Sequence, residues 1–384
     1  MQHSKEKKKV RIFHTGDVHL DSPFSRLDAQ SAQIRRRELR GVFTSMMLYA
    51  KTHRADIVLI AGDLFDVADA GEDTVSLIIR EFEKMPECRF VISAGNHDPL
   101  SPNSVYKLKK FPENVYIFPS DELFCYTFED LGVDVWGWSF TSKTLDKNLL
   151  RGKRANDNGN IQLLCAHCDI TNSASADAPV SVSDIESFGA GYSALGHIHR
   201  HEGIKKFSYG GAWGYSGAPE GRSYDECGEG GAYIADVSQG EVLPYEVDVS
   251  YVKFSVRSYE KEQLDLTGVG SAAEAEDKIR ALVKDKRYGD TTLLRLELRG
   301  EISPECTSFG AITAEELGLF SLDIRDNTSP TYDCARYEGD MSVKGAFYRV
   351  LADKLNSQDE EERACAREAL RIGFAALDGS EITR

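Results

Sequence analysis

Residues 89–98 read RFVISAGNHD, and the fold of the chain can be worked out from this stretch. It begins as a short apolar run with β-branched residues, which is typical of a buried strand. It then turns at Gly95 and continues with an amide, an imidazole and a carboxylate, from Asn96 to Asp98. Three polar side chains directly after a buried strand indicate a functional site if other strands end in the same way.

Strand and helix patterns alternate on the N-terminal side of this stretch. Val10 to Thr15 and Asp56 to Ala61 are predicted strands, and Arg89 to Ala94 is the third. Helices are predicted between them, over residues 31–52 and over Thr74 to Lys84, from the spacing of apolar residues. This β-α-β-α-β order predicts a parallel sheet that is covered on both faces.

The C-terminal side of the stretch has a different rhythm. Further strands are predicted at Val133–Trp138, Ile161–Cys165, Tyr192–Leu195, Phe207–Tyr209 and Ala232–Val237. Helical crossovers are scarce between these strands, so we expect a second, antiparallel sheet that packs against the first.

The character of the sequence changes again near residue 250. Strands over Tyr251–Val256 and Thr291–Leu298, with a helix over Ala272–Lys286, predict a small α+β unit. Two helices follow, and the first carries an apolar stripe of Val343, Phe347, Val350, Leu351 and Leu355. Ser357 to Glu360 reads as a capping box that opens the second helix. We therefore predict three domains, at residues 10–250, 251–335 and 336–384.

The 384 residues have an ordinary composition for a folded protein, with 41% hydrophobic residues. The longest aliphatic run, Ile57 to Ala61, is far shorter than the roughly 20 residues that cross a bilayer. The basic N-terminus leads into no signal-peptide core, so we expect a cytoplasmic protein that does not associate with membranes. The eight cysteines are scattered, as reduced thiols are. Cys165 and Cys168 have no second pair to complete a zinc ribbon and are expected in or near the core.

The net charge of −16 argues against binding of nucleic acid through an overall positive potential. The charge is uneven, because residues 1–54 carry 12 Lys and Arg against 5 Asp and Glu, a net of +7. Arg35, Arg36, Arg37 and Arg40 lie together on the first predicted helix. They form either a face that meets backbone phosphates or an ordinary solvated helix surface.

Three aromatic residues, Tyr209, Trp213 and Tyr215, lie close together in the later part of the sequence. Aromatic rings at a nucleic-acid site stack unpaired bases. The same residues could equally pack in the core, and the sequence leaves both interpretations open.

Five predicted strands end in carboxylate, amide or imidazole side chains. These residues are Asp17 and His19; Asp63 and Asp66; Asn96, His97 and Asp98; His167; and His197 and His199. The carboxyl ends of strands in an open α/β sheet form the edge where ligands bind. Hard oxygens mixed with imidazoles suit Mn²⁺, Fe or Zn²⁺. Two such cations about 3.5–4 Å apart activate water for attack on phosphorus, so the set predicts a two-metal hydrolase.

The series D-x-H, G-D-x-x-D, G-N-H-D, H and G-H-x-H resembles the calcineurin-like metallophosphoesterases, across residues 10 to about 240. Within that superfamily the chain is similar to the DNA repair exonucleases of the SbcD and Mre-type nuclease subunits. This likeness rests on three stretches: HTGDVHLDSPF at 14–24, GHIH at 196–199 with YGG at 209–211, and YSGAPEGR at 215–222. The residues AWG at 212–214 look like an insertion before the third stretch.

The resemblance implies a four-layer α/β/β/α metallophosphoesterase sandwich with a smaller C-terminal α+β appendage. It implies that one metal, expected to be Mn²⁺, is held by Asp17, His19 and His199, and a second by Asn96, His167 and His197, with Asp63 between them. It further implies that His97 acts as a general acid or stabilises the leaving oxygen, that Asp98 orients His97, and that Asp66 lies just outside the ligands.

The resemblance implies a metal-dependent phosphodiester hydrolase, namely a DNA exonuclease or endonuclease acting in DNA repair. A phosphatase or a nucleotide or lipid phosphodiesterase would use the same metals and is the alternative. A non-catalytic scaffold would normally show a broken set of ligands, and this set is intact. The expected partners are DNA, a coiled-coil ATPase subunit of the SMC type that docks on the C-terminal helices, and a second copy of the chain in a homodimer. The alternative for those helices is that they only cap the fold.

Overall fold

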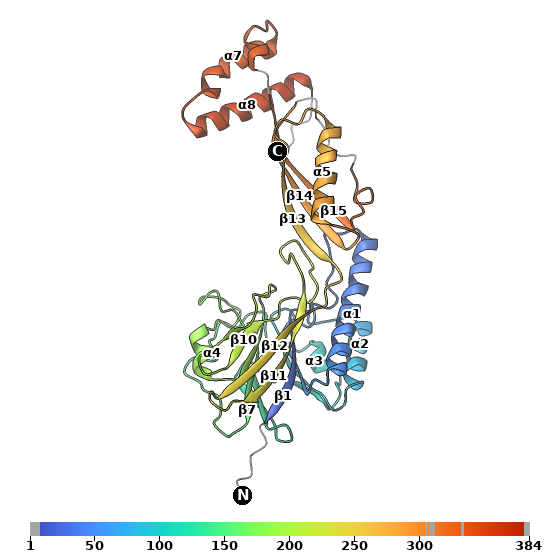
Figure 1. Ribbon diagram of the computed structural model, residues 1–384, viewed down its shortest axis with the longest axis vertical. Coiled ribbons are helices and arrows are strands. Elements are labelled where there is room, and N and C mark those ends of the chain that lie inside the picture. The colour runs from blue at the N-terminus through green and yellow to red at the C-terminus, as the bar shows by residue number, and fades with distance from the viewer. Residues whose placement is uncertain (1–7, 304–305, 307–311, 332–333, 380–384) are drawn as a thin grey trace. The chain divides into compact units, whose positions relative to one another are not determined.

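The structure is a computed structural model that describes residues 8–303, 306, 312–331 and 334–379. The basic residues 1–7 considered above lie outside the described residues. The chain forms two compact units, one ending at Tyr259 and the other beginning at Glu260 (Figure 1). The three domain boundaries predicted from the sequence stay a prediction. Within the described ranges, every helix is too short or too polar to span a membrane.

Two six-stranded sheets make up the first unit. The first sheet has the strand order β12 (Tyr245–Lys253), β11 (Gly231–Gln239), β1 (Lys9–Thr15), β2 (Ile57–Ala61), β3 (Arg89–Ser93) and β4 (Val115–Ile117). β1, β2 and β3 run parallel, as predicted, with α1 (Ala29–Thr52) and α2 (Glu72–Glu83) in their crossovers. The sequence prediction did not include β4, which continues the parallel sheet after the short α3 (Val105–Leu108). β11 and β12 extend the sheet antiparallel beyond β1.

The second sheet is mixed. Its strand order is β5 (Phe124–Phe128), β6 (Val133–Gly137), β7 (Ile161–His167), β8 (Tyr192–Gly196), β10 (Ala212–Tyr215) and β9 (Lys205–Lys206). The predicted antiparallel arrangement is wrong for its centre, because β6, β7, β8 and β10 run parallel and only the edge strands pair antiparallel. The crossovers here are long loops and the seven-residue α4 (Val182–Phe188), which is too short to give a clear helical periodicity.

Alternate side chains of the strands fill separate apolar cores. In β2, Val58 and Ile60 belong to the core under α1 and α2, whereas Ile57 and Leu59 belong to the core between the two sheets. A third core lies on the outer face of the second sheet and includes Phe188 of α4. Neighbouring residues of a strand point to opposite faces, so this division follows from the pleat. The layers are therefore α/β/β/α, as predicted (Figure 1).

The region around Phe207 to Tyr209 is a turn, and the prediction of a strand there was wrong. The amide of Phe207 donates to the Gly211 carbonyl, and the amide of Gly210 donates to the Phe207 carbonyl. Gly210 has a φ of 86°, a conformation that glycine adopts without strain. The segment reverses the chain between β9 and β10.

The second unit begins with a three-stranded sheet in the order β13 (Ser258–Asp265), β14 (Thr292–Ile302) and β15 (Ser321–Pro330). β14 and β15 are parallel, and α5 (Ala272–Lys286) packs Ile279 and Val283 into a core with Leu294 and Leu296. α6 (Cys334–Glu338), α7 (Val343–Leu355) and α8 (Glu360–Asp378) follow. This α+β composition confirms the predicted appendage.

Three details of the C-terminal half differ from the predictions. The predicted strand Tyr251–Val256 is wrong in its second half, because Tyr251 to Lys253 form the end of β12 in the first unit and residues 254–256 lie in the connection to β13. The predicted capping box at Ser357 is wrong, since the N-cap of α8 is Asp359, whose side chain accepts from the Glu361 amide. The predicted apolar stripe of α7 is only partly covered. Phe347, Leu351 and Leu355 pack beside α8, whereas Val343 and Val350 are 70% and 75% exposed.

Candidate metal centre

The predicted ligands follow directly on the strands that carry them. In the first sheet, β1 is followed by Asp17 and His19, β2 by Asp63, and β3 by Asn96. In the second sheet, β7 ends at His167, and β8 is followed by His197 and His199. The loops after β1 and β2 are joined by their backbones, because the Asp17 amide donates to the Gly62 carbonyl at 3.0 Å. The two sheets meet at the same edge, where the ring of His167 contacts the Ala61 carbonyl through Nδ1 at 3.1 Å.

Four of these residues have strained backbones. Asp17, His19, Asp63 and His197 have φ angles of 51°, 49°, 49° and 107°. Non-glycine residues seldom adopt positive φ, and each instance costs on the order of 1–3 kcal/mol when the surrounding structure enforces it. Such strain collects at functional sites, and here it turns four potential ligands toward one point.

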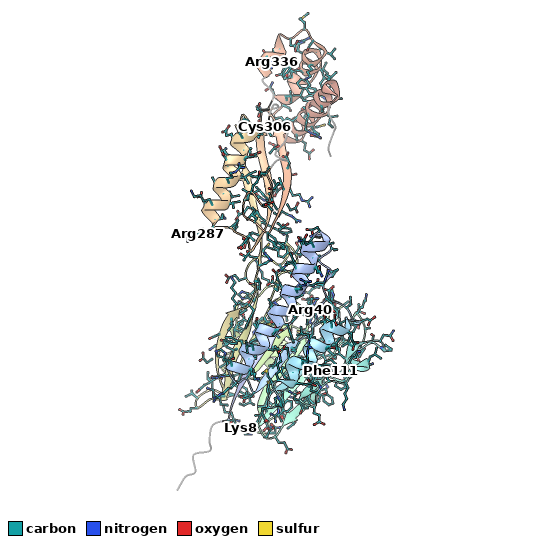
Figure 2. The ribbon with its side chains drawn as sticks, turned by 90° about the vertical axis from the view of Figure 1, so that its right-hand side faces the viewer. Lys8, Arg40, Phe111, Arg287, Cys306 and Arg336 are labelled. Atoms are coloured by element: carbon teal, nitrogen blue, oxygen red, sulfur yellow. The ribbon has the colours of Figure 1, made fainter. Side chains whose placement is uncertain are left out.

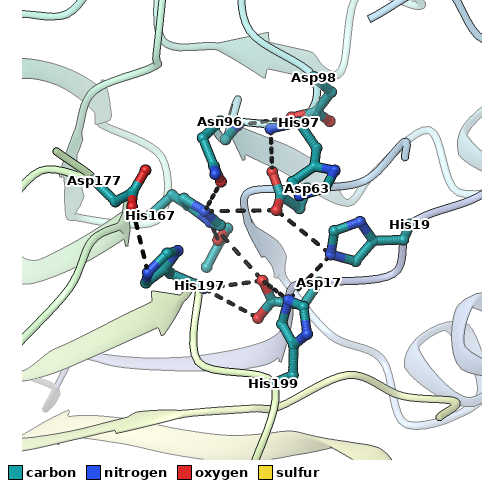
Figure 3. Close-up of polar contacts among 12 residues, drawn as sticks. Asp17, His19, Asp63, Asn96, His97, Asp98, His167, Asp177, His197 and His199 are labelled. Atoms are coloured by element: carbon teal, nitrogen blue, oxygen red, sulfur yellow. Dashed lines mark hydrogen bonds and ion pairs between the residues drawn. The ribbon is translucent and has the colours of Figure 1, made fainter. Parts of the chain in front are cut away.

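The first group of ligands consists of Asp17, His19, Asp63 and His199, whose ligand atoms all lie within 4.8 Å of one another. Nε2 of His19 lies 3.2 Å from Nε2 of His199 and 3.4 Å from Oδ2 of Asp63 (Figure 3). Nε2 of His199 lies 3.8 Å from Oδ1 of Asp17. These distances leave the four groups facing a common centre.

The second group lies on the other side of Asp63. Nε2 of His167 is 2.9 Å from Oδ1 of Asn96 and 3.7 Å from Oδ2 of Asp63. The His197 ring stands edge to face with His167, with 5.2 Å between the ring centroids. The Asp63 carboxylate thus approaches ligands of both groups, as a bridging residue must.

The chemistry of these atoms fits divalent cations. Burial holds the pKa values of His19 and His167 well below the usual range, so both rings are neutral and offer a lone pair. Burial raises the pKa of Asp17 to about 7 against the opposing charge of His199, and burial also raises that of Asp63. Burying carboxylates is costly unless their charge is paired, and a bound cation would provide that pairing. Mixed oxygen and nitrogen donors suit Mn²⁺, Fe or Zn²⁺.

A network behind the ligands holds the His199 imidazole by a hydrogen bond and places a carboxylate beside the His19 imidazole. Nδ1 of His19 lies 3.2 Å from Oδ1 of Asp66, and Nδ1 of His199 donates to Oε1 of Glu226 at 2.8 Å. Arg222 joins both carboxylates, since it donates to Asp66 and to Glu226 at 2.8 Å each. Burial raises the pKa of Glu226, but the hydrogen bond from His199 and the charge of Arg222 outweigh it and lower the pKa to about 2. The contacts at Nδ1 leave Nε2 of each histidine for a metal.

Two residues of this surrounding shell were missed by the sequence prediction. Glu226 is one, and the other is Asp177, whose Oδ2 lies 4.0 Å from Nε2 of His197 (Figure 3). Both lie in loops, outside any recognised motif. Arg222 was quoted as the end of a motif but received no role, and its position four residues before Glu226 was the available signal.

His97 lies at the mouth of the site and is exposed. Its ring stands edge to face with that of His19, with centroids 4.7 Å apart. Its Nδ1 is 3.2 Å from the Asp66 backbone carbonyl. A carbonyl only accepts hydrogen bonds, so Nδ1 carries a hydrogen and Nε2 is left for a substrate.

The predicted role of Asp98 needs a correction. Its buried carboxylate accepts from the amides of Gly95 and Phe65, at 2.7 and 3.1 Å, and from the Tyr106 hydroxyl at 2.6 Å. Asp98 therefore fixes the loops that carry Asn96 and His97, and it is the Asp66 carbonyl that contacts the His97 ring. The reason is that the Asp98 side chain is fully buried whereas His97 is exposed.

The features that suggested nucleic acid are only partly exposed. Arg35 is completely buried and is bound by Glu220, so it cannot meet a phosphate. Trp213 and Tyr215 are also buried, and the Tyr215 hydroxyl donates to the Cys168 carbonyl at 2.8 Å. Core packing is thus the correct interpretation for these two aromatic residues.

The calcineurin-like phosphoesterase family matches residues 10–201, which is half of the chain. The protein belongs to this family, and its His/Asp cluster is the dimetal site typical of the superfamily. It is a metallophosphoesterase, a hydrolase of phosphoester bonds.

Several curated proteins are similar to this chain. The uncharacterized metallophosphoesterase YhaO of Bacillus subtilis is 27% identical over 303 residues, 76% of this chain and 72% of that protein. The DNA double-strand break repair protein Mre11 of Methanopyrus kandleri is 23% identical, over 66% of this chain and 61% of that protein. The SbcD component of the SbcCD nuclease of Staphylococcus epidermidis is 22% identical, over 92% of this chain and 96% of that protein.

Among solved structures, a dimetal phosphatase from Danio rerio is similar to this chain. It is 12% identical and has a TM-score of 0.40, over 64% of this chain and 99% of that one.

Proposed function

We propose that this metallophosphoesterase cleaves phosphodiester bonds of DNA, as an exonuclease or endonuclease in DNA repair. The observation that carries the hydrolytic part is the position of the Asp63 carboxylate, 3.4 Å from the His19 ring and 3.7 Å from the His167 ring. Support for the substrate comes from the names of two distant relatives, a break-repair protein and a nuclease component. The second of these aligns over 92% of this chain, including much of the second unit.

The residues divide the work in this proposal. When bound, two divalent cations supply positive charge beside the phosphate and lower the pKa of a water molecule. His97 lies outside the ligand groups, and in this proposal its ring carries a hydrogen on both nitrogens, so that Nε2 donates a proton to the leaving oxygen while Nδ1 stays bound to the Asp66 carbonyl. Asp66 fixes the His97 ring through its backbone carbonyl and approaches the His19 ring with its carboxylate. One residue thereby contacts the acid and lies beside a metal ligand.

A cleavage assay with two substrates tests the proposal. Wild-type chain is incubated with Mn²⁺ and either linear duplex DNA or para-nitrophenyl phosphate, and the Asp63→Asn variant serves as the inactive control. We expect degradation of the duplex that requires Mn²⁺ and is lost in the variant. Rapid turnover of the monoester with intact DNA would instead favour the phosphatase alternative.

We also propose that α7 contributes to a docking site for a coiled-coil ATPase subunit of the SMC type. Val343 and Val350 are seven residues apart, on the same face of the helix, and both are largely exposed. Met341, just before the helix, is 93% exposed. Apolar side chains that gather on one face mark interaction sites more often than single ones do.

Co-purification with such an ATPase tests the docking proposal. Deletion of residues 340–384 and the substitution pair Val343→Glu and Val350→Glu are both expected to abolish binding. Ala281→Glu, an exposed position on α5 rather than on the α7 face, is the matched control and should bind normally. Unchanged binding by the deletion variant would contradict docking there. In that case the helices only cap the fold.

The proposed homodimer is a separate expectation, and measurement of the mass of the protein in solution tests it.

We propose a cytoplasmic location as well. Cys88, Cys165 and Cys168 are buried free thiols. Unpaired thiols are typical of a reducing compartment. Fractionation of cells should find the protein with the cytoplasmic markers, and recovery in the membrane or secreted fraction would contradict this.

A further inference from the structure

A cationic groove lies between the outer sides of α1 and α2. It encloses about 590 Å³, and its charged and polar lining consists of Arg37, Arg40, Thr44, Asp73, Ser76 and Arg80. The groove is distinct from the metal centre, and Figure 2 views the molecule onto this side, with Arg40 on α1. Gly41 also lines the groove, and there is open space beside it, since a Cβ at that position would meet no atom within 4 Å.

The charge of the groove is unusual for this protein. Its lining has three arginines against one acid, Asp73, in a chain with a net charge of −16. Arg37 and Arg80 are both exposed, and neither pairs with a carboxylate of the residues that the structure describes. Arg35, by contrast, is buried against Glu220. Two guanidinium groups, one on each wall, are thus available to an anion.

The groove begins close to the metal centre. Arg40 contacts Oδ1 of Asp21 at 3.0 Å, and Asp21 also accepts from the Thr74 hydroxyl and the Gly71 amide at the start of α2. Asp21 comes two residues after the ligand His19, a separation of at most about 7 Å along the chain. A chain of phosphates that enters the metal centre could therefore continue over Arg40 toward Arg37 and Arg80.

We propose that this groove binds the phosphate backbone of the nucleic-acid substrate, beside the bond that is cleaved. The inference rests on the proposed nuclease function. Two free guanidinium groups on two helices, Arg37 and Arg80, match successive phosphates, because each can form paired hydrogen bonds to one phosphate, and Arg40 adds positive charge between them and the metal centre although it is paired with Asp21. Backbone contacts of this kind give affinity without sequence preference and are sensitive to salt.

Binding of a fluorescent duplex, measured by anisotropy with EDTA present, tests this inference without any cleavage. The double variant Arg37→Gln and Arg80→Gln removes the two free guanidinium groups, and both residues are exposed, so folding should not change. The control pair, Arg151→Gln and Arg154→Gln, removes the same charge from another exposed part of the first unit. Arg37→Lys with Arg80→Lys keeps the charge.

We expect the groove variant to bind the duplex about tenfold more weakly than the wild type. The plot of log affinity against log salt concentration should also become less steep, by about 0.9 for each lost phosphate contact and so by about 2 in all. The control pair should match the wild type, and the lysine pair should restore most of the slope. Equal binding and slope in the groove variant and the wild type would overturn the inference, as would an equal loss in the control. The proposed function fails separately, if wild-type protein with Mn²⁺ leaves the duplex intact.

Discussion

Arg222 donates a hydrogen bond to the carboxylate of Asp66 at 2.8 Å and so connects the loop after β10 with the loop after β2. The same guanidinium contacts Glu226, which holds His199, while Asp66 approaches His19. One arginine therefore links the carboxylate that holds His199 to the carboxylate that lies beside His19. The motif YSGAPEGR supplies it, together with the Glu220 that binds the buried Arg35.

The substitution Arg222→Gln is expected to weaken metal binding by about 10–100-fold, the usual effect of losing a group that orients metal ligands. Titration with Mn²⁺ measures this directly. Arg11→Gln is the matched control, since Arg11 pairs with Asp236 on β11, away from the ligands. Equal Mn²⁺ affinity in the Arg222 variant and the control would show that the network does not position the ligands.

Removal of the His97 imidazole should leave both metals bound and reduce hydrolysis. We expect His97→Ala to cleave DNA about 10²–10⁴-fold more slowly, the usual contribution of a general acid. A diester with a para-nitrophenol leaving group needs little proton donation, so its hydrolysis should fall much less. If both substrates lost activity equally, or if metal content fell, the assignment of His97 as the acid would be wrong.

Gly95 leaves the space that Asp63 needs. A Cβ at this position would lie 2.1 Å from Oδ1 of Asp63 and 2.7 Å from its backbone nitrogen. The Gly95→Ala substitution should therefore displace the bridging carboxylate and abolish tight binding of one metal, as measured by metal content per chain. Gly41→Ala is the control. It meets no atom within 4 Å, and in a helix interior it should raise stability by about 0.5–1 kcal/mol. Full metal content in Gly95→Ala would contradict the bridging role.

The buried His14 should make stability depend on pH. Its Nδ1 contacts the Tyr192 hydroxyl at 3.0 Å and its Nε2 contacts the Leu195 carbonyl at 3.2 Å. Burial lowers the pKa of His14 from 6.5 to about 3. Between those values the unfolded chain binds a proton that the folded chain does not, so stability falls as pH falls below 6.5 and is fully present above it.

Urea denaturation of the metal-free protein between pH 5 and 7 measures this effect. At the steepest part, His14 should contribute a loss of about 1.4 kcal/mol per pH unit. The His14→Gln variant lacks the titrating group, so its stability should decline less over the same range. Parallel curves for the two proteins would rule out this role.

The sequence was sufficient for the main features of the fold and the site. Each of the three parallel strands β1, β2 and β3 ends directly before its polar residues, so the sheet edge could be inferred from local patterns alone. The roles of Glu226 and Asp177 could not be inferred in this way, because their partners His199 and His197 lie 27 and 20 residues away on other loops. The burial of Arg35 was also missed. Its partner Glu220 is 185 residues distant, and no local pattern reports such a contact.

Electron paramagnetic resonance of the Mn²⁺-loaded protein tests the central claim, that seven side chains hold two cations around Asp63. We expect two Mn²⁺ ions per chain with the spectrum of a spin-coupled pair, and loss of that coupling in Asp63→Asn. A single uncoupled ion in the wild type, or an unchanged coupled spectrum in Asp63→Asn, would contradict it.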